Sequence, residues 1–175
     1  MLNWRLIHEV GYLKFFYRYP IRQISKRIFR IDNTLKLKNG IAINLPPNSR
    51  FGTELFLKNG YVDWGSEEYL IKHLEPEKTF LDVGANIGYY SLLLAPYCHS
   101  VYAFEPDPRS LAALEQNASK VNNITIIQEA VYSEVGEMPL NISNLPEFSN
   151  LQTTSDKVGC VNVKVNTLDN SIRFS

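Results

Sequence analysis

The clearest pattern of apolar and polar positions lies in the middle of the chain. Residues 80–83, apolar except for one acid, stand between turn residues, which is typical of a buried parallel strand. Two glycines follow, and the apolar residues between 87 and 95 favour a helix packed on a sheet until Pro96 interrupts them. A second strand is expected at 100–104, directly before Glu105. The pattern therefore predicts a strand, a glycine turn, a helix and a second strand, as in a parallel α/β sheet.

A β-hairpin is expected before this unit, and more strands are expected after it. Residues 34–37 and 40–45 have alternating character, and the Asn-Gly pair at 39–40 between them is a strong hairpin signal. Further strands are expected at 124–128, 136–142 and 160–166.

A short helix is expected between the hairpin and the first central strand. Ser66 is placed to cap it, and its acidic first turn, which begins with Glu67, suits the positive end of a helix dipole. The stretch before this helix is expected to be rich in loops. Its residues Tyr61, Asp63 and Trp64 are a candidate acceptor site or lid, although Trp64 is equally suited to packing.

The even charge balance of the chain hides an asymmetry between its two ends. The 18 Lys and Arg residues balance the 18 Asp and Glu residues. Residues 1–30, however, carry seven basic residues and one acidic residue. The remainder of the chain carries eleven basic and seventeen acidic residues. Aromatic residues are interleaved with the basic ones. This basic segment is not a signal peptide, because basic residues interrupt its apolar runs, and no stretch of the chain is long enough to span a bilayer.

A helix is expected over residues 21–29 of this basic segment. It would place Ile21, Ile24 and Ile28 on one side and most of the basic residues on the other. One hypothesis is an ordinary amphipathic helix that docks on the core and leaves its lysines in water. The other is peripheral contact of residues 1–30 with an anionic membrane surface or another polyanion. The sequence leaves both open.

The residues that point to chemistry cluster at the glycine turn. A dinucleotide loop, G-x-G-x-x-G, would have glycines where Asn86 and Tyr89 stand. The spacing is instead D-x-G-x-N-x-G, formed by Asp82, Gly84, Asn86 and Gly88. The first acid of such a loop is placed to orient the ammonium group of a bound amino acid, as in a loop that binds S-adenosylmethionine. The alternative is that the glycines only allow a tight turn and that Asp82 is a solvated strand end.

Glu105 adds a second signal to the glycine turn. It lies about twenty residues beyond the turn, at the carboxyl end of the neighbouring strand, where an acid accepts hydrogen bonds from the ribose hydroxyls of an adenosine. The site is therefore expected to hold a nucleoside. No metal site is expected, because Cys98, Cys160 and the three histidines lack metal-ligand spacing, and free thiols in a reducing cytoplasm are the default.

Four words of the sequence resemble the FkbM-type methyltransferases, a family of S-adenosylmethionine-dependent enzymes. These words are FLDVGANIGYYS, VYAFEPDP, NNITIIQEAVYSEVGEMPL and VNVKVNTLDN, and the resemblance covers about residues 65–170. It implies a Rossmann-like, doubly wound α/β sheet of the class I methyltransferase type with S-adenosylmethionine as cofactor. It also implies that Glu105 holds the ribose and that Glu129 contacts adenine, although a solvated strand-end acid is an equal alternative for Glu129. The residues implied at the methionine end are Asp82, Gly84, Asn86 and Gly88.

The sequence departs from the pattern of this family at its end. The family continues past the T-L-D word into a strand that ends in an I-D-V-E-G-like motif, whereas this sequence stops at Ser175. We therefore expect an apparently truncated methyltransferase domain over 65–175, preceded by a helical and β-hairpin extension over 1–64. Half of the sheet would be absent, which would leave a strand edge open to self-association.

The expected function is methylation by S-adenosylmethionine, in the cytoplasm, of a hydroxyl group of a sugar, a polysaccharide precursor or a secondary metabolite. The partner is then a small-molecule or glycan acceptor, and no nucleic acid is expected. The sequence does not assign a catalytic residue. The alternatives are an inactive truncated fragment or a non-enzymatic interaction module of the same family and, with less support, an NAD-dependent oxidoreductase.

Overall fold

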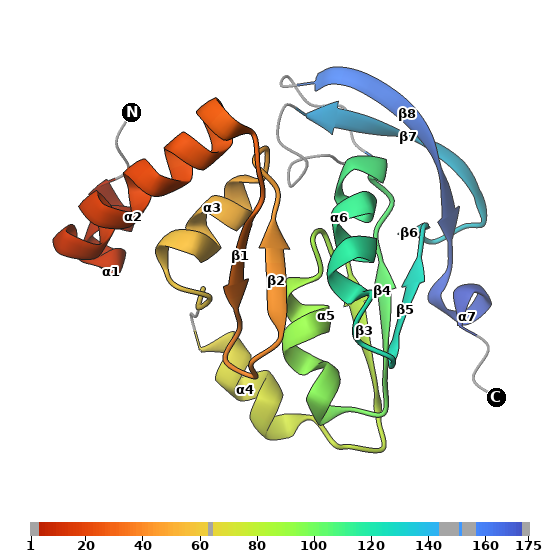
Figure 1. Ribbon diagram of the computed structural model, residues 1–175. Helices are drawn as coiled ribbons and strands as arrows, with labels where there is room; N and C mark the ends of the chain where they lie inside the picture. The colour runs from red at the N-terminus through yellow and green to blue at the C-terminus, as the bar shows by residue number, and fades with distance from the viewer. Residues whose placement is uncertain (1–3, 63–64, 144–150, 152–156, 173–175) are drawn as a thin grey trace. The chain divides into compact units, whose positions relative to one another are not determined.

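The computed structural model describes residues 4–62, 65–143, 151 and 157–172, and Figure 1 shows their path. The chain divides into two compact units, Met1–Trp64 and Gly65–Ser175. Their sequences differ in charge: the first unit has eleven basic and four acidic residues, and the second has seven and fourteen. The first unit therefore carries a formal charge of +7 and the second a charge of −7.

The first unit combines helices with a two-stranded hairpin. Its elements are α1 (Trp4–Val10), α2 (Tyr12–Ile24), η1 (Ser25–Phe29), β1 (Asn33–Lys36), β2 (Ala42–Leu45) and α3 (Arg50–Leu57). The expected hairpin is confirmed, because β1 and β2 pair antiparallel. Gly40 adopts a φ of 84° in the connection, a conformation that glycine adopts without strain. Helix α3 was not predicted; Ser49 caps it by accepting a hydrogen bond of 2.8 Å from the Gly52 amide.

The basic helix is longer than expected, and the hypothesis that its isoleucine side docks on the core is wrong. The helix begins at Tyr12, and η1 is a π-helical turn that continues α2. Ile24 is 45% exposed and Ile28 is 69% exposed, whereas Arg22 is fully buried. The Arg22 guanidinium donates to the backbone carbonyls of Leu45 and Pro46, which follow one another at the end of β2. These hydrogen bonds hold the Arg22 side of the helix inward.

The second unit contains a parallel sheet with helical crossovers. Its elements are α4 (Ser66–His73), β3 (Thr79–Val83), α5 (Tyr89–Leu94), η2 (Ala95–Tyr97), β4 (Ser100–Phe104), α6 (Pro108–Ala118), β5 (Ile124–Ile127), β6 (Ala130–Val131), β7 (Gly136–Ser143), β8 (Lys157–Asn166) and α7 (Leu168–Ser171). The strands β3, β4 and β5 pair in parallel in that order. Figure 1 shows α5 and α6 on one face of this sheet. The expected α/β class with a parallel sheet is confirmed.

The central strand of this sheet is the best buried of the three. Val101 and Ala103 of β4 are fully buried, and Ala103 packs with Leu114 of α6. The expectation that the first strand is buried is wrong in part, because Val83 is 55% exposed and Phe80 is half-buried. Among the described residues β3 pairs with β4 only, so its second edge is open there.

The two later strands form a sheet of their own. β7 and β8 pair antiparallel, and β6 adds in parallel to the other edge of β8. The strand predictions for 136–142 and 160–166 are therefore confirmed, with β8 beginning earlier than expected. In the part of the chain that the structure describes, no helix is both long and apolar enough to cross a membrane.

Candidate cofactor site

The glycine loop lies between β3 and α5, at the carboxyl ends of the parallel strands. The amides of Gly84 and Ala85 both donate to the carbonyl of Phe104, at 2.9 Å each, and tie the loop to the end of β4. On the other side, the Asn117 side chain on α6 donates to the Ile87 carbonyl at 2.8 Å. The loop is thus fixed from two elements by hydrogen bonds within the chain, and a ligand would meet a preformed backbone.

The two glycines of the loop have different surroundings. Both have a positive φ, 81° at Gly84 and 87° at Gly88, which strains any other residue. A Cβ atom at Gly84 would meet nothing within 4 Å, and this glycine is exposed. A Cβ atom at Gly88 would lie 2.7 Å from Leu114 Cδ1 of α6. Gly84 therefore leaves open space at the loop surface, whereas Gly88 lets α6 pack closely.

Glu105 is buried at the end of β4, with only 6% of its surface exposed. Its Oε2 accepts a hydrogen bond of 2.7 Å from the Asn86 amide, and its Oε1 accepts one of 2.8 Å from the Asp107 amide. Burial raises the pKa of Glu105, with further increases from the charges of Asp107 and Asp82, while the two amide donors oppose the rise. Because each carboxylate oxygen has two acceptor positions, both oxygens keep capacity for another donor.

Asn86 brings a second polar group to the same place. Its φ of 51° is left-handed, a conformation that asparagine tolerates better than most residues. Its backbone amide is committed to Glu105. Its side-chain Oδ1 is buried and accepts no hydrogen bond within the described residues. A buried acceptor of this kind is costly unless a donor reaches it, so Oδ1 is suited to a ligand N–H or O–H group.

Asp82 lies at the end of β3 and is not the solvated strand end of the alternative hypothesis, because only 8% of its surface is exposed. Its Oδ2 accepts from both the amide and the hydroxyl of Ser91, at 3.0 and 2.5 Å. Burial raises the pKa of Asp82, and the bonds from Ser91 oppose the rise. One carboxylate oxygen is therefore engaged in holding α5, next to the glycine loop.

Glu129 stands apart from the glycine loop, after β5. Its Oε2 accepts hydrogen bonds from the Asn166 side chain at 3.1 Å and from the Ser171 hydroxyl at 3.0 Å. It lines a cavity of about 500 Å³ with Pro106, which follows Glu105, and with the apolar Ile127. The cavity thus extends from the residues after β4 to the residues after β5, along the carboxyl ends of two neighbouring strands.

The pair formed by Glu67 and Tyr89 was not expected from the sequence. Glu67 is 1% exposed and accepts a hydrogen bond from the Tyr89 hydroxyl, directly after the glycine loop. The prediction that Ser66 caps this helix is wrong, because Gly65 is the N-cap, with a φ of 88° and no side-chain bond. The signal was the position of Glu67 on the same helical face as Leu70, which marks it as inward-facing.

Of the candidate acceptor stretch, the structure describes Tyr61. Tyr61 belongs to the first unit, where the Lys38 ammonium lies 3.7 Å from the centre of its ring. Asp63 and Trp64 lie outside the described residues. Across the described ranges, no cluster of three His, Cys, Asp or Glu side chains is arranged to hold a metal ion.

Two curated relatives are similar to part of this chain. A probable ribosomal RNA small subunit methyltransferase A from Methanosarcina acetivorans is 32% identical over 97 residues, which are 55% of this chain and 35% of that protein. A ribosomal RNA small subunit methyltransferase A from Dichelobacter nodosus is 31% identical over 77 residues, 41% of this chain and 29% of that protein. The matched part of the chain thus spans about a third of the length of these relatives.

Solved structures give weaker similarities. Trm5b from Pyrococcus abyssi has a TM-score of 0.44 at 22% identity and covers 58% of this chain and 32% of its own. M. jannaschii TYW2 in complex with AdoMet has a TM-score of 0.42 at 19% identity, with coverages of 61% and 53%.

The family assignment comes from a match to a family as a whole. The Methyltransferase FkbM domain matches residues 82–175, a range that includes the glycine loop, Glu105 and the strands β4 to β8. This range is more than half of the chain. The resemblance carried by the sequence words is thereby confirmed, and the chain belongs to the FkbM methyltransferase family.

Proposed function

We propose that residues 65–175 bind S-adenosylmethionine and that the protein methylates a hydroxyl group of a sugar, a polysaccharide precursor or a secondary metabolite, in the cytoplasm. The observation that carries the proposal is the buried Glu105 carboxylate, held by the Asn86 and Asp107 amides beside the open space at Gly84. Family membership supports the same chemistry.

The residues present fit the groups of this cofactor. Glu105 offers free acceptor positions to the two ribose hydroxyls, and its two oxygens are already oriented by backbone amides. The cavity between Pro106 and Ile127 offers an apolar surface to the adenine ring, with Glu129 at its edge. The unsatisfied Oδ1 of Asn86 is an acceptor for the ammonium group at the methionine end.

The chemistry explains why so few polar residues are needed. When bound, S-adenosylmethionine supplies a methyl group that its sulfonium already activates for transfer. The protein then has to hold the acceptor in line and to exclude water. The fixed loop provides the rigid side of such a site, because hydrogen bonds from α6 and to the end of β4 hold its backbone.

The proposal also names a class of acceptor, a compound with a free hydroxyl group. The two curated relatives are named for ribosomal RNA, which makes RNA the principal rival acceptor. The unit 65–175 carries seven basic and fourteen acidic residues, a charge of −7 that opposes a polyanion near the site. A neutral hydroxyl acceptor avoids that repulsion.

Calorimetric titration with S-adenosylhomocysteine tests the cofactor. Replacing Glu105 by Ala removes the acceptor of the ribose hydroxyls, and we expect a loss of about 1.5 to 3 kcal/mol, roughly tenfold or more in affinity. Glu115→Ala is the matched control, because Glu115 is an exposed glutamate on α6. Equal affinities of wild type and Glu105→Ala would remove Glu105 from the site, and binding of NADH instead of S-adenosylhomocysteine would favour the oxidoreductase.

Transfer of a labelled methyl group tests the acceptor. We expect label on free sugars or on neutral glycans, and none on ribosomal RNA. Label on RNA only would replace the hydroxyl acceptor proposed here. Binding of S-adenosylhomocysteine with no transfer to any acceptor would favour the non-enzymatic alternative for this chain.

A further inference from the structure

One side of the continuous helix α2–η1 carries large apolar side chains that stand in solvent. Each of them is at least 38% exposed, and Leu13 is 91% exposed. Spacings of three and four residues place them on one side of the helix. We call this side the apolar face; it consists of Leu13, Phe16, Tyr17, Ile21, Ile24 and Ile28. Contiguous exposed apolar surface of this kind marks an interaction site more often than chance.

Hydrogen bonds on the opposite side fix the direction of the apolar face. Arg22 is fully buried. Arg18 donates to the Phe56 carbonyl at 2.8 Å and also lies over the ring of that residue. Lys26 donates to the Thr53 hydroxyl at 3.1 Å. Turning the apolar face inward would break these bonds and expose the Arg22 acceptors, so the helix is held with its apolar side outward.

Positive charge surrounds the apolar face. Lys14 stands next to Leu13 in the sequence and is exposed, and Arg27 is exposed near the other end of the helix. The one acid of residues 1–30, Glu9, is engaged by Arg5 at 3.0 Å and by Lys58 at 2.8 Å, contacts that lower its pKa. The helix that carries the apolar face therefore presents more positive than negative charge to solvent.

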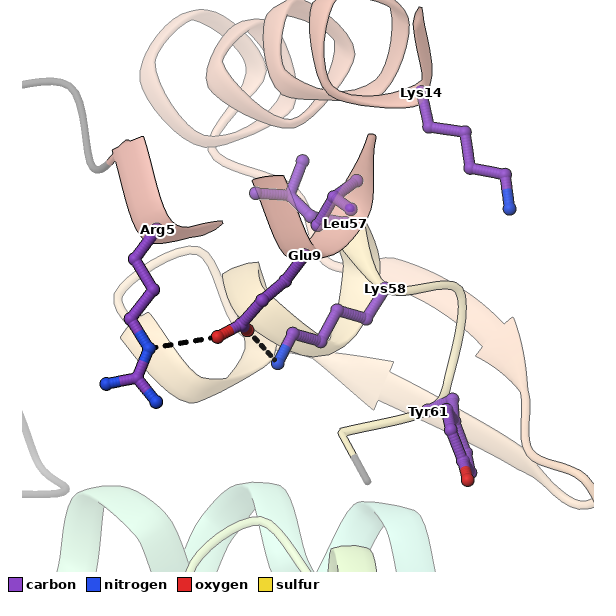
Figure 2. A pocket seen from close by; sticks show the side chains of 7 residues that line it. Arg5, Glu9, Lys14, Leu57, Lys58 and Tyr61 are labelled. Atoms are coloured by element: carbon purple, nitrogen blue, oxygen red, sulfur yellow. Dashed lines mark hydrogen bonds and ion pairs between the residues drawn. The ribbon is translucent and has the colours of Figure 1, made fainter. Parts of the chain in front are cut away.

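Figure 2 shows a cavity of about 530 Å³ in the first unit, whose charged lining residues are Arg5, Glu9, Lys14 and Lys58. Arg5 and Lys58 point toward Glu9, and the Lys14 ammonium points away from that group. Lys14 belongs to α2, the helix that carries the apolar face, and it is exposed, so its charge can attract an anionic partner of that helix.

We propose that the apolar face of α2–η1 lies on an anionic lipid bilayer. A helix with aromatic and aliphatic residues on one side and basic residues at its margins binds at the boundary of head groups and acyl chains. The acyl region takes up the apolar face, and the head-group charge attracts Lys14 and Arg27. Two other partners fit less well. RNA would meet the charges and could stack on Phe16 and Tyr17, but it would leave the aliphatic residues of the apolar face without a partner. A second copy would bring two units of charge +7 together.

The test is co-sedimentation of the full chain with vesicles, and the quantity measured is the partition coefficient between water and lipid. We expect binding to vesicles of phosphatidylcholine mixed with phosphatidylserine, and little binding to phosphatidylcholine alone. Leu13→Glu should weaken the partition coefficient by on the order of tenfold, because a charge replaces the most exposed apolar side chain. Arg27→Gln should weaken it by about fivefold. Val135→Glu is the matched control, because Val135 is an apolar residue of the second unit that is 65% exposed.

Each outcome decides the proposal, provided that circular dichroism shows the variants to be folded. Failure of the wild type to bind the anionic vesicles would overturn it, and so would equal loss in Leu13→Glu and Val135→Glu. Concentration-dependent dimers that Leu13→Glu abolishes would identify a second copy as the occupant. Retention on RNA that Arg27→Gln weakens and Leu13→Glu leaves unchanged would identify RNA. None of these results depends on cofactor binding.

Discussion

The glycine loop of the second unit and the helix α2 of the first unit are both held by buried hydrogen bonds, but the groups that donate these bonds differ. In the loop, backbone amides supply most of the bonds, and they donate to the Phe104 carbonyl and to the Glu105 side chain at the end of β4. In α2, one side chain, Arg22, donates to strand-end carbonyls and to Asn33. The loop follows from its own backbone path, whereas the side of α2 that faces inward depends on acceptors elsewhere in the fold.

The apolar side of α2 is outside because the bonds of Arg22 hold the opposite side inward. Apolar periodicity predicts which residues share a side of a helix but not which side is buried. Unsatisfied carbonyls at the end of β2 would cost about 1 to 3 kcal/mol each in a buried place, comparable with the gain from burying an isoleucine. The Arg22 guanidinium donates to the Leu45 carbonyl and to the Asn33 side chain. It also donates to the Pro46 carbonyl, which accepts from the Ser49 amide as well. These bonds together compete successfully with the apolar face for the interior.

The largest expected effect comes from Arg22→Met. Methionine retains much of the volume but donates no hydrogen bond, so the carbonyls of Leu45 and Pro46 lose their Arg22 donor. We expect a loss of about 3 to 5 kcal/mol in the free energy of unfolding, because each buried acceptor that loses its donor costs about 1 to 3 kcal/mol and Arg22 also donates to the Asn33 side chain. Urea denaturation of the full chain measures this loss. Burial lowers the pKa of Arg22 to about 10, so the side chain that methionine replaces is still charged at neutral pH.

Arg27→Met is the control for this prediction. Arg27 is an exposed arginine on the same helix, and its replacement should change stability by no more than about 0.5 kcal/mol. Similar losses in the two variants would mean that the buried network does not determine the orientation of α2, and the contrast with the loop would disappear.

The next largest effect separates the two glycines of the loop. Alanine at either position is strained by the positive φ, which should lower the free energy of unfolding by about 1 to 2 kcal/mol. At Gly88 the added Cβ also meets Leu114, so the loss of stability should reach about 2 to 4 kcal/mol. Gly84→Ala should cost only the smaller amount but should weaken S-adenosylhomocysteine binding, because its Cβ projects into the open space.

Thermal melts and calorimetry on the two alanine variants measure this separation. A Gly84→Ala variant with unchanged affinity would show that the open space is not part of the cofactor site. If Gly88→Ala were no less stable than Gly84→Ala, the close approach of α6 would not be limiting, and the loop would be softer than its hydrogen bonds indicate.

Local signals predicted much of the fold. The strand expected at 100–104 is β4, Ser100–Phe104, because a short apolar run between turn residues has few other solutions in an α/β sheet. The helix α3 was missed, since its eight residues include a glycine and a threonine that hide the periodicity, although Ser49 marked its start. A cap and a short apolar stripe are weaker signals than a strand between turns.

The features that were not predicted depend on contacts between residues that a sequence pattern does not bring together. Glu67 agreed with the rule that acids favour the start of a helix, yet its carboxylate is buried against Tyr89. At the candidate site the spacing predicted which residues lie in the loop, but it did not predict that Gly88 faces α6 or that Ser91 engages Asp82. Burial and partner geometry decide these roles.

Tyr89→Phe should have a smaller effect on stability than Arg22→Met or Gly88→Ala. The variant removes the hydrogen bond to the buried Glu67 carboxylate, and bonds to charged groups contribute about 1.5 to 3 kcal/mol. The lost stability should appear in urea denaturation, and a cycle with Glu67→Gln measures how much of it belongs to the pair. Strictly additive losses would show that the two residues act independently and that α4 is not fastened to the loop through them.

The smallest expected effect is on the pH dependence of cofactor affinity. The ribose acceptor must be ionised, and the pKa of Glu105 is raised by burial, so the affinity for S-adenosylhomocysteine should begin to fall at a higher pH than an ordinary glutamate would give. The decline is limited to about tenfold per pH unit for one group. The Glu105→Gln variant should bind S-adenosylhomocysteine more weakly, and its affinity should change less with pH because residue 105 no longer titrates. The pH dependence that remains should come from Asp82, whose pKa is also raised.

Acid unfolding does not mimic this decline. A carboxyl group whose pKa is higher in the folded state than in the unfolded state takes up its proton first when folded, so neither Glu105 nor Asp82 destabilises the fold as the pH falls through that range. Calorimetry between about pH 8 and about pH 5, with circular dichroism at each step, separates the two processes. An identical pH profile in wild type and Glu105→Gln would mean that this carboxylate does not contact the ligand, and the rigid loop would then serve the fold alone.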